Sequence, residues 1–258
     1  MLLAIDIGNS ATKFGVFNQG NLISRFTVPT VRAATDDEIN SQIKSNYTES
    51  FSAIVISSVV PESNEAYRKL AGKFYNLTAV FVDNKFDFGL VINYQPPESV
   101  GVDRMIAAFA AVEKYGKSCV VGDFGTATTI DAVNSSGEYL GGIIAPGMNL
   151  LADALFRKTS QLPKIKIEKP AQVIGDSTIK SIQSGIYFGY IGLVDGIITR
   201  MIGELGETPR VIATGGFARL IAAGAESIQT VDETLMLDGL RLIYEKTRPV
   251  KPVGEVRD

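Results

Sequence analysis

The sequence predicts an α/β protein in which one structural unit occurs twice. A buried strand, a polar turn and a returning strand span Leu2 to Phe17, and the same pattern returns from Val120 to Val133. Each turn follows an Asp-x-Gly motif, so that aligning Asp6 with Asp123 also aligns the glycines behind them. Helical segments separate the β-rich runs. Repetition over nearly half a chain is typical of a duplicated domain.

The first half has four predicted strands and three predicted helices. A third strand over Leu22–Val28 follows the turn residues Asn18–Asn21. The short run Ala53–Ser58 is β-rich and ends in small residues. Three helices are predicted: a surface helix over Asp36–Asn46, where the apolar spacing is weak, an amphipathic helix over Glu62–Tyr75, and a helix with a clearer apolar face over Asp103–Tyr115.

The second half repeats this organisation. After the turn Asn134–Gly137 comes a strand over Tyr139–Ile144, and Arg210–Gly215 resembles Ala53–Ser58. The Gly-rich segment Asp176–Gly203 predicts a long helix that breaks near Gly189 or Gly192, because glycine is a poor helix former.

The two halves are expected to meet at Gly116, so that residues 1–115 form one domain and 116–258 the other. The tail from Arg248, rich in proline and charge, is expected to be frayed.

Composition excludes several classes of protein. The chain has 258 residues, 45% of them hydrophobic, and a net charge of −3 without a cluster of basic residues. This favours a globular protein and argues against a nucleic-acid partner. The start of the sequence lacks the basic region of a signal peptide, and the apolar run Ile186–Ile198 is interrupted by Asp195. We therefore expect no membrane partner.

Histidine is absent and cysteine occurs once, as Cys119 in an apolar run. An intrachain disulfide is excluded, which favours a reducing, cytoplasmic location. We interpret Cys119 as a buried structural residue. Without histidine, acid–base chemistry falls to carboxylates, lysine or tyrosine.

The turn after Asp6 has the chemistry of a phosphate-binding loop. A carboxylate can hold Mg²⁺ directly or through water, and Gly8 allows the backbone to approach a phosphate. Lys13 can neutralise a transferring phosphoryl group. Since Asp, Gly, Asn and Ser are also turn formers, a plain hairpin turn explains these residues equally well.

The pair of turns is more informative than either one. Two Asp-x-Gly hairpins, with a late Gly215-Gly216 turn after a strand, resemble the actin, Hsp70 and sugar-kinase superfamily. That resemblance implies duplicated ribonuclease-H-like (actin-like) domains, each a mixed sheet flanked by helices, with the active-site cleft between them. No GxxxxGK[ST] segment occurs, which argues against a P-loop fold.

A narrower resemblance rests on an ordered set of motifs. The chain resembles type III pantothenate kinases through Asp6-Ile7-Gly8-Asn9-Ser10, Gly101-Val102-Asp103-Arg104, Asp123-Phe124-Gly125-Thr126-Ala127-Thr128, Gly141-Gly142-Ile143-Ile144-Ala145-Pro146-Gly147, Leu162-Pro163 and Ile174-Gly175-Asp176-Ser177-Thr178. Pro96-Pro97 stands where the family usually has Asn-Pro.

The resemblance implies roles for individual residues. ATP would contact Asp6, Ile7, Gly8, Asn9, Ser10, Ala11, Thr12, Lys13, Thr126, Gly215 and Gly216. Pantothenate would contact Tyr94, Gly101, Val102, Asp103, Arg104 and, from the partner subunit of a homodimer, Thr178. Mg²⁺ would lie near Asp6, and Asp123 would hold K⁺ or ammonium. Asp103 would be the general base, although its local sequence alone favours a helix N-cap, a role that does not exclude catalysis.

The implied reaction is phosphorylation of pantothenate by ATP, which is the first step of coenzyme A synthesis. Three alternatives stay open: a kinase of the same fold for another hydroxyl substrate, a nucleotide-responsive accessory protein without catalysis, and an actin-like filament. The intact Asp6, Lys13, Asp103 and Asp123 favour an enzyme.

Overall fold

The computed structural model describes residues 1–247 and contains two compact units. One comprises Met1–Phe86 with the described chain from Leu237, and the other Asp87–Met236. The bounds differ from the halves 1–115 and 116–258 because the predicted helix ending at Tyr115 packs within the second unit, and the last helix returns to the first. The division of the repeat at residue 115 stays a prediction. The tail from Arg248 lies outside the described residues.

The first unit is built on a five-stranded sheet with the order β3-β2-β1-β4-β5. The central strand β1 is buried along its whole length. It pairs antiparallel with β2 and parallel with β4. A strand with neighbours on both edges and side chains packed on both faces requires such a continuous apolar run. The strands are β1 Leu2–Ile7, β2 Ala11–Asn18, β3 Asn21–Pro29, β4 Ala53–Ser58 and β5 Val80–Phe81.

Helices α1 (Asp36–Asn46) and α2 (Asn64–Tyr75) contribute to the core of this sheet, as Ile39, Ile43 and Leu70 show. Helix α1 begins with a capping box in which Thr35 and Glu38 satisfy each other's backbone N–H groups. The short helix η1 (Pro61–Ser63) precedes α2, and the last helix, α7, spans Leu235–Thr247. The two predicted helices of this unit are confirmed.

The second unit repeats the topology. Its sheet has the order β11-β10-β7-β8-β9-β6, and its first five strands match β5-β4-β1-β2-β3 in order and direction. The predicted duplication of a mixed α/β fold is therefore confirmed. The strands are β6 Val91–Ile92, β7 Cys119–Phe124, β8 Ala127–Val133, β9 Glu138–Pro146, β10 Arg210–Thr214 and β11 Thr230–Val231.

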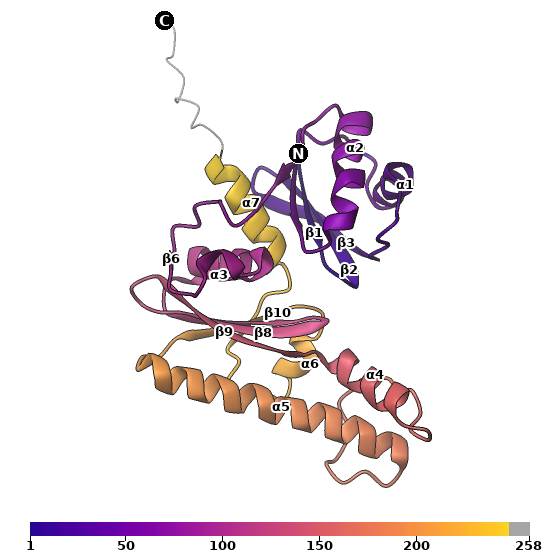
Figure 1. The fold of residues 1–258 in the computed structure, drawn as a ribbon, viewed down its shortest axis with the longest axis vertical. Coiled ribbons are helices and arrows are strands. Elements are labelled where there is room, and N and C mark those ends of the chain that lie inside the picture. The colour runs from indigo at the N-terminus through magenta and orange to yellow at the C-terminus, as the bar shows by residue number, and fades with distance from the viewer. Residues whose placement is uncertain (248–258) are drawn as a thin grey trace, which may run out of the picture. The chain divides into compact units, whose positions relative to one another are not determined.

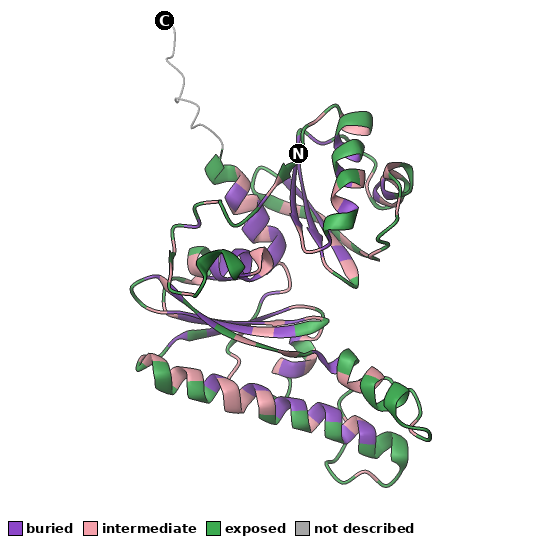
Figure 2. Cartoon of the chain, viewed as in Figure 1, coloured by how far each residue is buried: buried purple, intermediate pink, exposed green. Residues whose placement is uncertain are grey.

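Helices cover both faces of the second sheet (Figure 1). Helix α3 (Val102–Tyr115) lies on one face, and α5 (Thr178–Leu205) with the short α6 (Ala218–Ala222) lies on the other. Helix α3 is buried over most of its length, whereas α5 alternates between buried and exposed residues (Figure 2). The remaining helices of this unit are η2 (Pro97–Ser99) and α4 (Met148–Lys158).

Helix α5 corrects one prediction, because it runs unbroken through Gly189 and Gly192. Both glycines face open space, so they create no packing conflict. The buried side chains of the helix, among them Tyr187, Tyr190 and Val194, hold it on the sheet. Tertiary packing of this kind outweighs the low helix propensity of glycine.

By length and composition alone, α5 is long and apolar enough to cross a membrane. Its buried residues, including Ile182, Ile186 and Ile198, belong to the core cluster formed with strands β7, β8 and β10. A core helix of a folded domain passes the same test of length and composition, so the helix alone is weak support for a membrane span.

Candidate active site

The first Asp-x-Gly turn, between β1 and β2, is held by hydrogen bonds to the backbone of Gly8. The N–H of Gly8 donates to the carbonyl of Ala11 (3.1 Å), and the hydroxyl of Thr30 donates to the carbonyl of Gly8 (2.7 Å). A Cβ at Gly8 would lie 3.0 Å from the Ala11 carbonyl oxygen, so a side chain there would crowd the turn. Asn9 and Ser10 at its tip are exposed. The turn is therefore tightly closed and presents its tip to solvent.

Three polar residues lie side by side where this turn leaves the sheet. Asp6 is opposite Lys13 on β2 and opposite Ser57 on β4. The Lys13 ammonium lies 3.6 Å from the Asp6 carboxylate. The Ser57 hydroxyl is fully buried and has no hydrogen-bond partner within residues 1–247. The structure thus brings together Asp6 and Lys13, as predicted, and adds Ser57, which the sequence did not identify.

The second turn, between β7 and β8, is packed by two glycines from other segments. A Cβ on Gly147 would lie 2.3 Å from the Gly125 carbonyl oxygen, and a Cβ on Gly215 would lie 2.4 Å from an Asp123 carboxylate oxygen. Gly215 also has a φ of +94°, a conformation that favours glycine. Only glycine therefore fits at these two positions. The predicted Asp123 and Gly215 are therefore neighbours, and Thr126 lies in the turn that follows Asp123.

The two turns are not identical in register. Asp6 is opposite Lys13, whereas Asp123 is opposite Thr129, because the second turn is shorter. The ungapped sequence alignment instead matched Thr12 with Thr129. The position of the lysine is therefore occupied by a hydroxyl side chain in the second copy. This difference in charge suits two turns with different ligands.

The start of α3 places the predicted base. Gly101 is the N-cap residue and makes no side-chain cap, whereas Asp103 lies within the first turn. An Asp103 carboxylate oxygen accepts a hydrogen bond from the backbone N–H of Arg104 (2.9 Å). A Cβ on Gly101 would lie 2.5 Å from this oxygen. The structure thus assigns the N-cap to Gly101, and the carboxylate of Asp103 remains half-exposed.

Arg104 lies in a buried network that the sequence did not predict. Its Nε donates to Asp131 on β8 (3.1 Å), its Nη2 is 2.5 Å from the same carboxylate, and the hydroxyl of Tyr139 on β9 donates to Asp131 (2.7 Å). Burial lowers the pKa of Arg104, but Asp131 outweighs this and raises it above its usual value. Arg104 is therefore a fixed, permanently charged group.

Tyr94 packs against Arg104. Its ring covers the Arg104 guanidinium at 5.8 Å, and a Cβ on Gly141 would lie 2.8 Å from the ring. The predicted substrate residues Tyr94, Gly101, Val102, Asp103 and Arg104 are thus neighbours. An acidic residue inside the buried strand β8 was the one sequence signal that could have identified Asp131.

Thr178 lies apart from these residues. It is exposed at the start of α5, behind the N-cap Ser177, whose hydroxyl accepts from the Lys180 N–H (3.4 Å). Helix α5, which begins at Thr178, and helix α3, whose first turn holds Asp103, cover opposite faces of the sheet (Figure 1).

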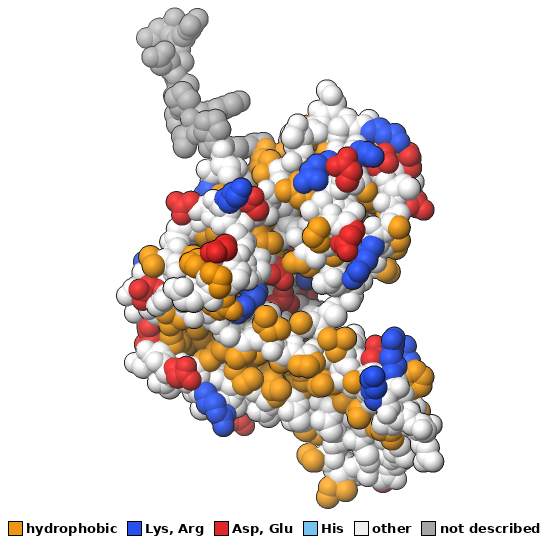
Figure 3. All heavy atoms as spheres, viewed as in Figure 1, with side chains coloured by type: hydrophobic (Ala, Val, Ile, Leu, Met, Phe, Trp, Pro, Cys, Tyr) orange, Lys and Arg blue, Asp and Glu red, His pale blue; other side chains and the backbone are white. Residues whose placement is uncertain are grey.

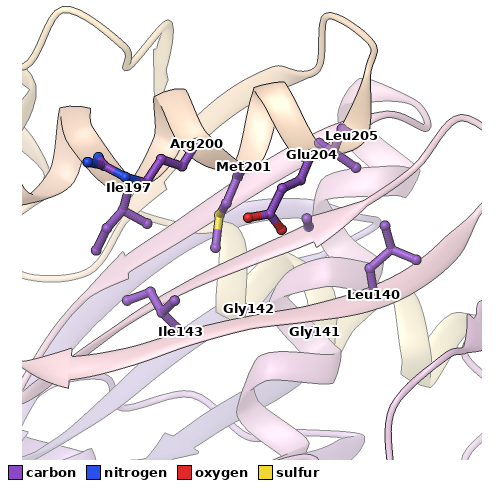
Figure 4. A pocket seen from close by; sticks show the side chains of 10 residues that line it. Leu140, Gly141, Gly142, Ile143, Ile197, Arg200, Met201, Glu204 and Leu205 are labelled. Carbon is purple, nitrogen blue, oxygen red and sulfur yellow. The ribbon is translucent and has the colours of Figure 1, made fainter.

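A cavity of about 480 Å³ lies on the α5 side of the same sheet, between β9 and the C-terminal half of α5. Met201 and Glu204 extend from α5 toward β9 (Figure 4). None of the predicted site residues lines this cavity. Its lining is Ala132, Leu140, Gly141, Gly142, Ile143, Ile197, Arg200, Met201, Glu204 and Leu205.

Comparisons with solved structures agree with the duplicated fold. The chain is similar to a putative 2-dehydro-3-deoxygalactonokinase from Sinorhizobium meliloti (TM-score 0.62, 12% identity, 97% of this chain and 100% of that one). It is also similar to a putative Baf family transcriptional activator from Campylobacter jejuni (TM-score 0.60, 20% identity, 95% and 98%). These likenesses show the fold.

Sequence comparisons show the family. The profile described as "Type III pantothenate kinase" matches residues 2–200. Proteins of that name are 42% identical in Koribacter versatilis (96% of both chains) and 43% identical in Geotalea uraniireducens (96% of this chain and 99% of that one). One from Halalkalibacterium halodurans is 41% identical, over 95% of this chain and 99% of that one. The chain belongs to the type III pantothenate kinase family.

Proposed function

We propose that this protein transfers the γ-phosphoryl group of ATP to the primary hydroxyl of pantothenate, giving ADP and 4′-phosphopantothenate in the first step of coenzyme A synthesis. The observation that carries this proposal is identity above 40% over nearly the whole chain with proteins named for that activity. The proposal places the protein in the cytoplasm and gives it no nucleic-acid or membrane partner.

The first turn would bind the ATP phosphates. Backbone N–H groups at the exposed tip, Asn9 and Ser10, can donate to phosphate oxygens, and Lys13 can neutralise the transferred group. Asp6 would hold Mg²⁺ through water. No cluster of three metal-ligating side chains occurs in residues 1–247. A magnesium ion held in this way would keep waters and phosphate oxygens as most of its ligands.

The second unit would supply the remaining contacts. Asp123, half-exposed beside Gly215, would hold K⁺ or ammonium, while Thr126 and the Gly215-Gly216 turn would contact ATP. Bound cations would neutralise phosphate charge. Tyr94 and the Gly101–Arg104 segment would bind pantothenate.

Asp103 would accept the proton of the pantothenate hydroxyl while the hydroxyl oxygen attacks the γ-phosphorus of ATP. The bond between the γ-phosphorus and the oxygen of the departing ADP would break in the same step. A loose transition state of this kind needs alignment more than base strength. The half-exposed carboxylate at the start of α3, oriented by the Arg104 N–H, supports this role.

The active assembly would be a homodimer in which Thr178 contacts the pantothenate of the partner subunit. Hydrophobic side chains gather on the visible face of the second unit, over β8 and β9 (Figure 3). Gly185, Gly189 and Gly192 leave open space along the exposed side of α5, where another helix could approach closely. The exposed large hydrophobics of this unit are Val91, Leu140, Ile144, Leu150, Leu155, Phe156, Val173, Ile174, Ile179 and Val231.

The test is ADP release by the purified protein with ATP, Mg²⁺, K⁺ and pantothenate. We expect Asp103→Asn to lower kcat by about 10²- to 10⁴-fold, the usual contribution of a general base. Glu113→Gln on the same helix is the matched control and should retain activity, because Glu113 is exposed near its far end. ADP release by wild type that does not depend on pantothenate would contradict the proposed substrate.

A further inference from the structure

Arg104, Asp131 and Tyr139, called here the Arg104 network, form a buried group of hydrogen-bonded polar side chains. Arg104 is 6% exposed, Asp131 2% and Tyr139 0%. Asp131 accepts hydrogen bonds from Arg104 Nε and Nη2 and from the Tyr139 hydroxyl. Three elements contribute, since Arg104 comes from α3, Asp131 from β8 and Tyr139 from β9. The network therefore fixes one helix end against two strands.

Stability alone explains such a network poorly. A buried ion pair costs desolvation free energy, and apolar residues of similar volume often stabilise a fold as well or better. What the network does provide is a fixed direction for one guanidinium and for the backbone that carries it. That backbone N–H in turn holds the Asp103 carboxylate at 2.9 Å.

The neighbours of the network indicate what it orients. The Tyr94 ring lies over the Arg104 guanidinium and, at 6.4 Å, beside the Tyr139 ring. All predicted pantothenate contacts of this unit except Thr178 are therefore in the network or next to it. Neither Asp131 nor Tyr139 was among them.

The Arg104 network tethers the start of helix α3 to the sheet, and a second tether holds the other end of the helix. The second tether serves as a comparison for the first. At its C-terminal end, Lys114 pairs with Asp232 (2.6 Å), and the Tyr115 hydroxyl donates to the same carboxylate (2.8 Å). Asp232 is 7% exposed, so it too is a buried carboxylate held by a cation and a tyrosine. No predicted site residue takes part. Both tethers hold a buried carboxylate through a cation and a tyrosine, although the Lys114 side chain is 26% exposed and that of Arg104 only 6%.

We infer that Asp131, supported by Tyr139, is a positioning residue for pantothenate: it holds Arg104 and the first turn of α3 in the geometry that binds the substrate. The inference rests on the proposed function, because it assumes that Arg104 and Asp103 face pantothenate. Asp131 itself acts through Arg104 and need not touch the substrate.

The experiment compares Asp131→Asn with Asp232→Asn. For each, kcat, the KM for pantothenate, the KM for ATP and Tm are measured. We expect both to lower Tm, since each removes the charge from one buried partner. Only Asp131→Asn should raise the KM for pantothenate, by about tenfold, as for other residues that orient a ligand-binding group. The KM for ATP should not rise in either variant, because neither carboxylate lies next to the predicted ATP contacts of the first turn.

Tyr139→Phe keeps the ion pair and removes one donated hydrogen bond, so it covers the case in which Asp131→Asn does not fold. It should raise the KM for pantothenate in the same direction. An unchanged KM for pantothenate in both network variants, or an equal rise in Asp232→Asn, would overturn the inference. Wild-type protein that shows no pantothenate-dependent turnover would instead contradict the proposed function.

Discussion

Burial determines which side chains of this protein can react. Cys119 at the start of β7 is fully buried, and burial raises the pKa of its thiol to about 12. Its interpretation as a structural cysteine is confirmed by this placement. By contrast, Asp103 and Asp123 are half-exposed at the ends of their elements, where a small ligand can reach them. Reactivity at this scale follows from position within an element more than from residue type.

Cys119 gives a prediction for single residues. Because the thiolate is the reacting form, a pKa of about 12 against an ordinary value of 9.0 leaves ~1,000-fold less thiolate at neutral pH. We expect a disulfide reagent to modify the native protein at a rate set by unfolding, and the protein in denaturant at once. Absorbance of the released thiol dye measures both rates. Rapid native labelling would show that Cys119 is accessible.

Site residues that belong to short sequence motifs could be predicted from sequence, and isolated polar residues inside strands could not. Asp6, Gly8 and the Gly215 turn belong to short motifs whose residues contact one another locally. Asp131 meets Arg104 only after α3 has packed across β8, a contact between distant segments that no local pattern records. The same holds for Ser57, which lies beside Asp6 through parallel pairing of β4 with β1.

Among the elements, α3 connects the fold to the site, because its start carries Asp103 and its ends are both tied to buried carboxylates. A helix with a clear apolar face was predicted well: Asp103–Tyr115 was expected, and α3 spans Val102–Tyr115. The two-residue strands β5, β6 and β11 were missed, since so short a segment has no period. Helices α4 and α7 were missed as well.

The Asp232 tether gives a prediction at this scale. Burial alone would raise the pKa of Asp232, but hydrogen bonds from Lys114 and Tyr115 outweigh it and hold the pKa below its usual value. A depressed carboxyl pKa stabilises the fold above the unfolded pKa, which is about 3.9, and this stabilisation is lost as pH falls through the folded pKa. Tm of the wild type should therefore fall more steeply than that of Asp232→Asn between about pH 5 and pH 3. Parallel curves would show that another carboxylate governs acid unfolding.

At the scale of the whole molecule, the two units share the order of five strands. Their Asp-x-Gly turns nevertheless carry different side chains. The sequence repeat predicted this topology, because strand, turn and return recur together with their Asp-x-Gly motif. It did not predict the shorter second turn, which places Thr129 where the first copy has Lys13. Nor did it predict that α7 returns to the first unit, since nothing in that helix indicates its packing partner.

The proposed homodimer predicts complementation between two defective chains. If Thr178 acts on the partner's pantothenate, a dimer of Asp103→Asn with Thr178→Ala has one site that combines an intact Asp103 with an intact Thr178. If equal amounts of the two chains pair at random, about a quarter of the sites are then wild type. If Thr178 instead acts in the site of its own chain, no site is wild type. ADP release after the chains are unfolded and refolded together measures this.

The matched control replaces the Asp103→Asn chain with a chain carrying both substitutions. No site in that mixture can combine the two intact residues, so its turnover should stay at the level of Thr178→Ala alone. The sheet that separates α3 from α5 within one chain is the reason to expect recovery only in the first mixture. Equal turnover in the two mixtures would place Thr178 in its own subunit's site or outside the site altogether.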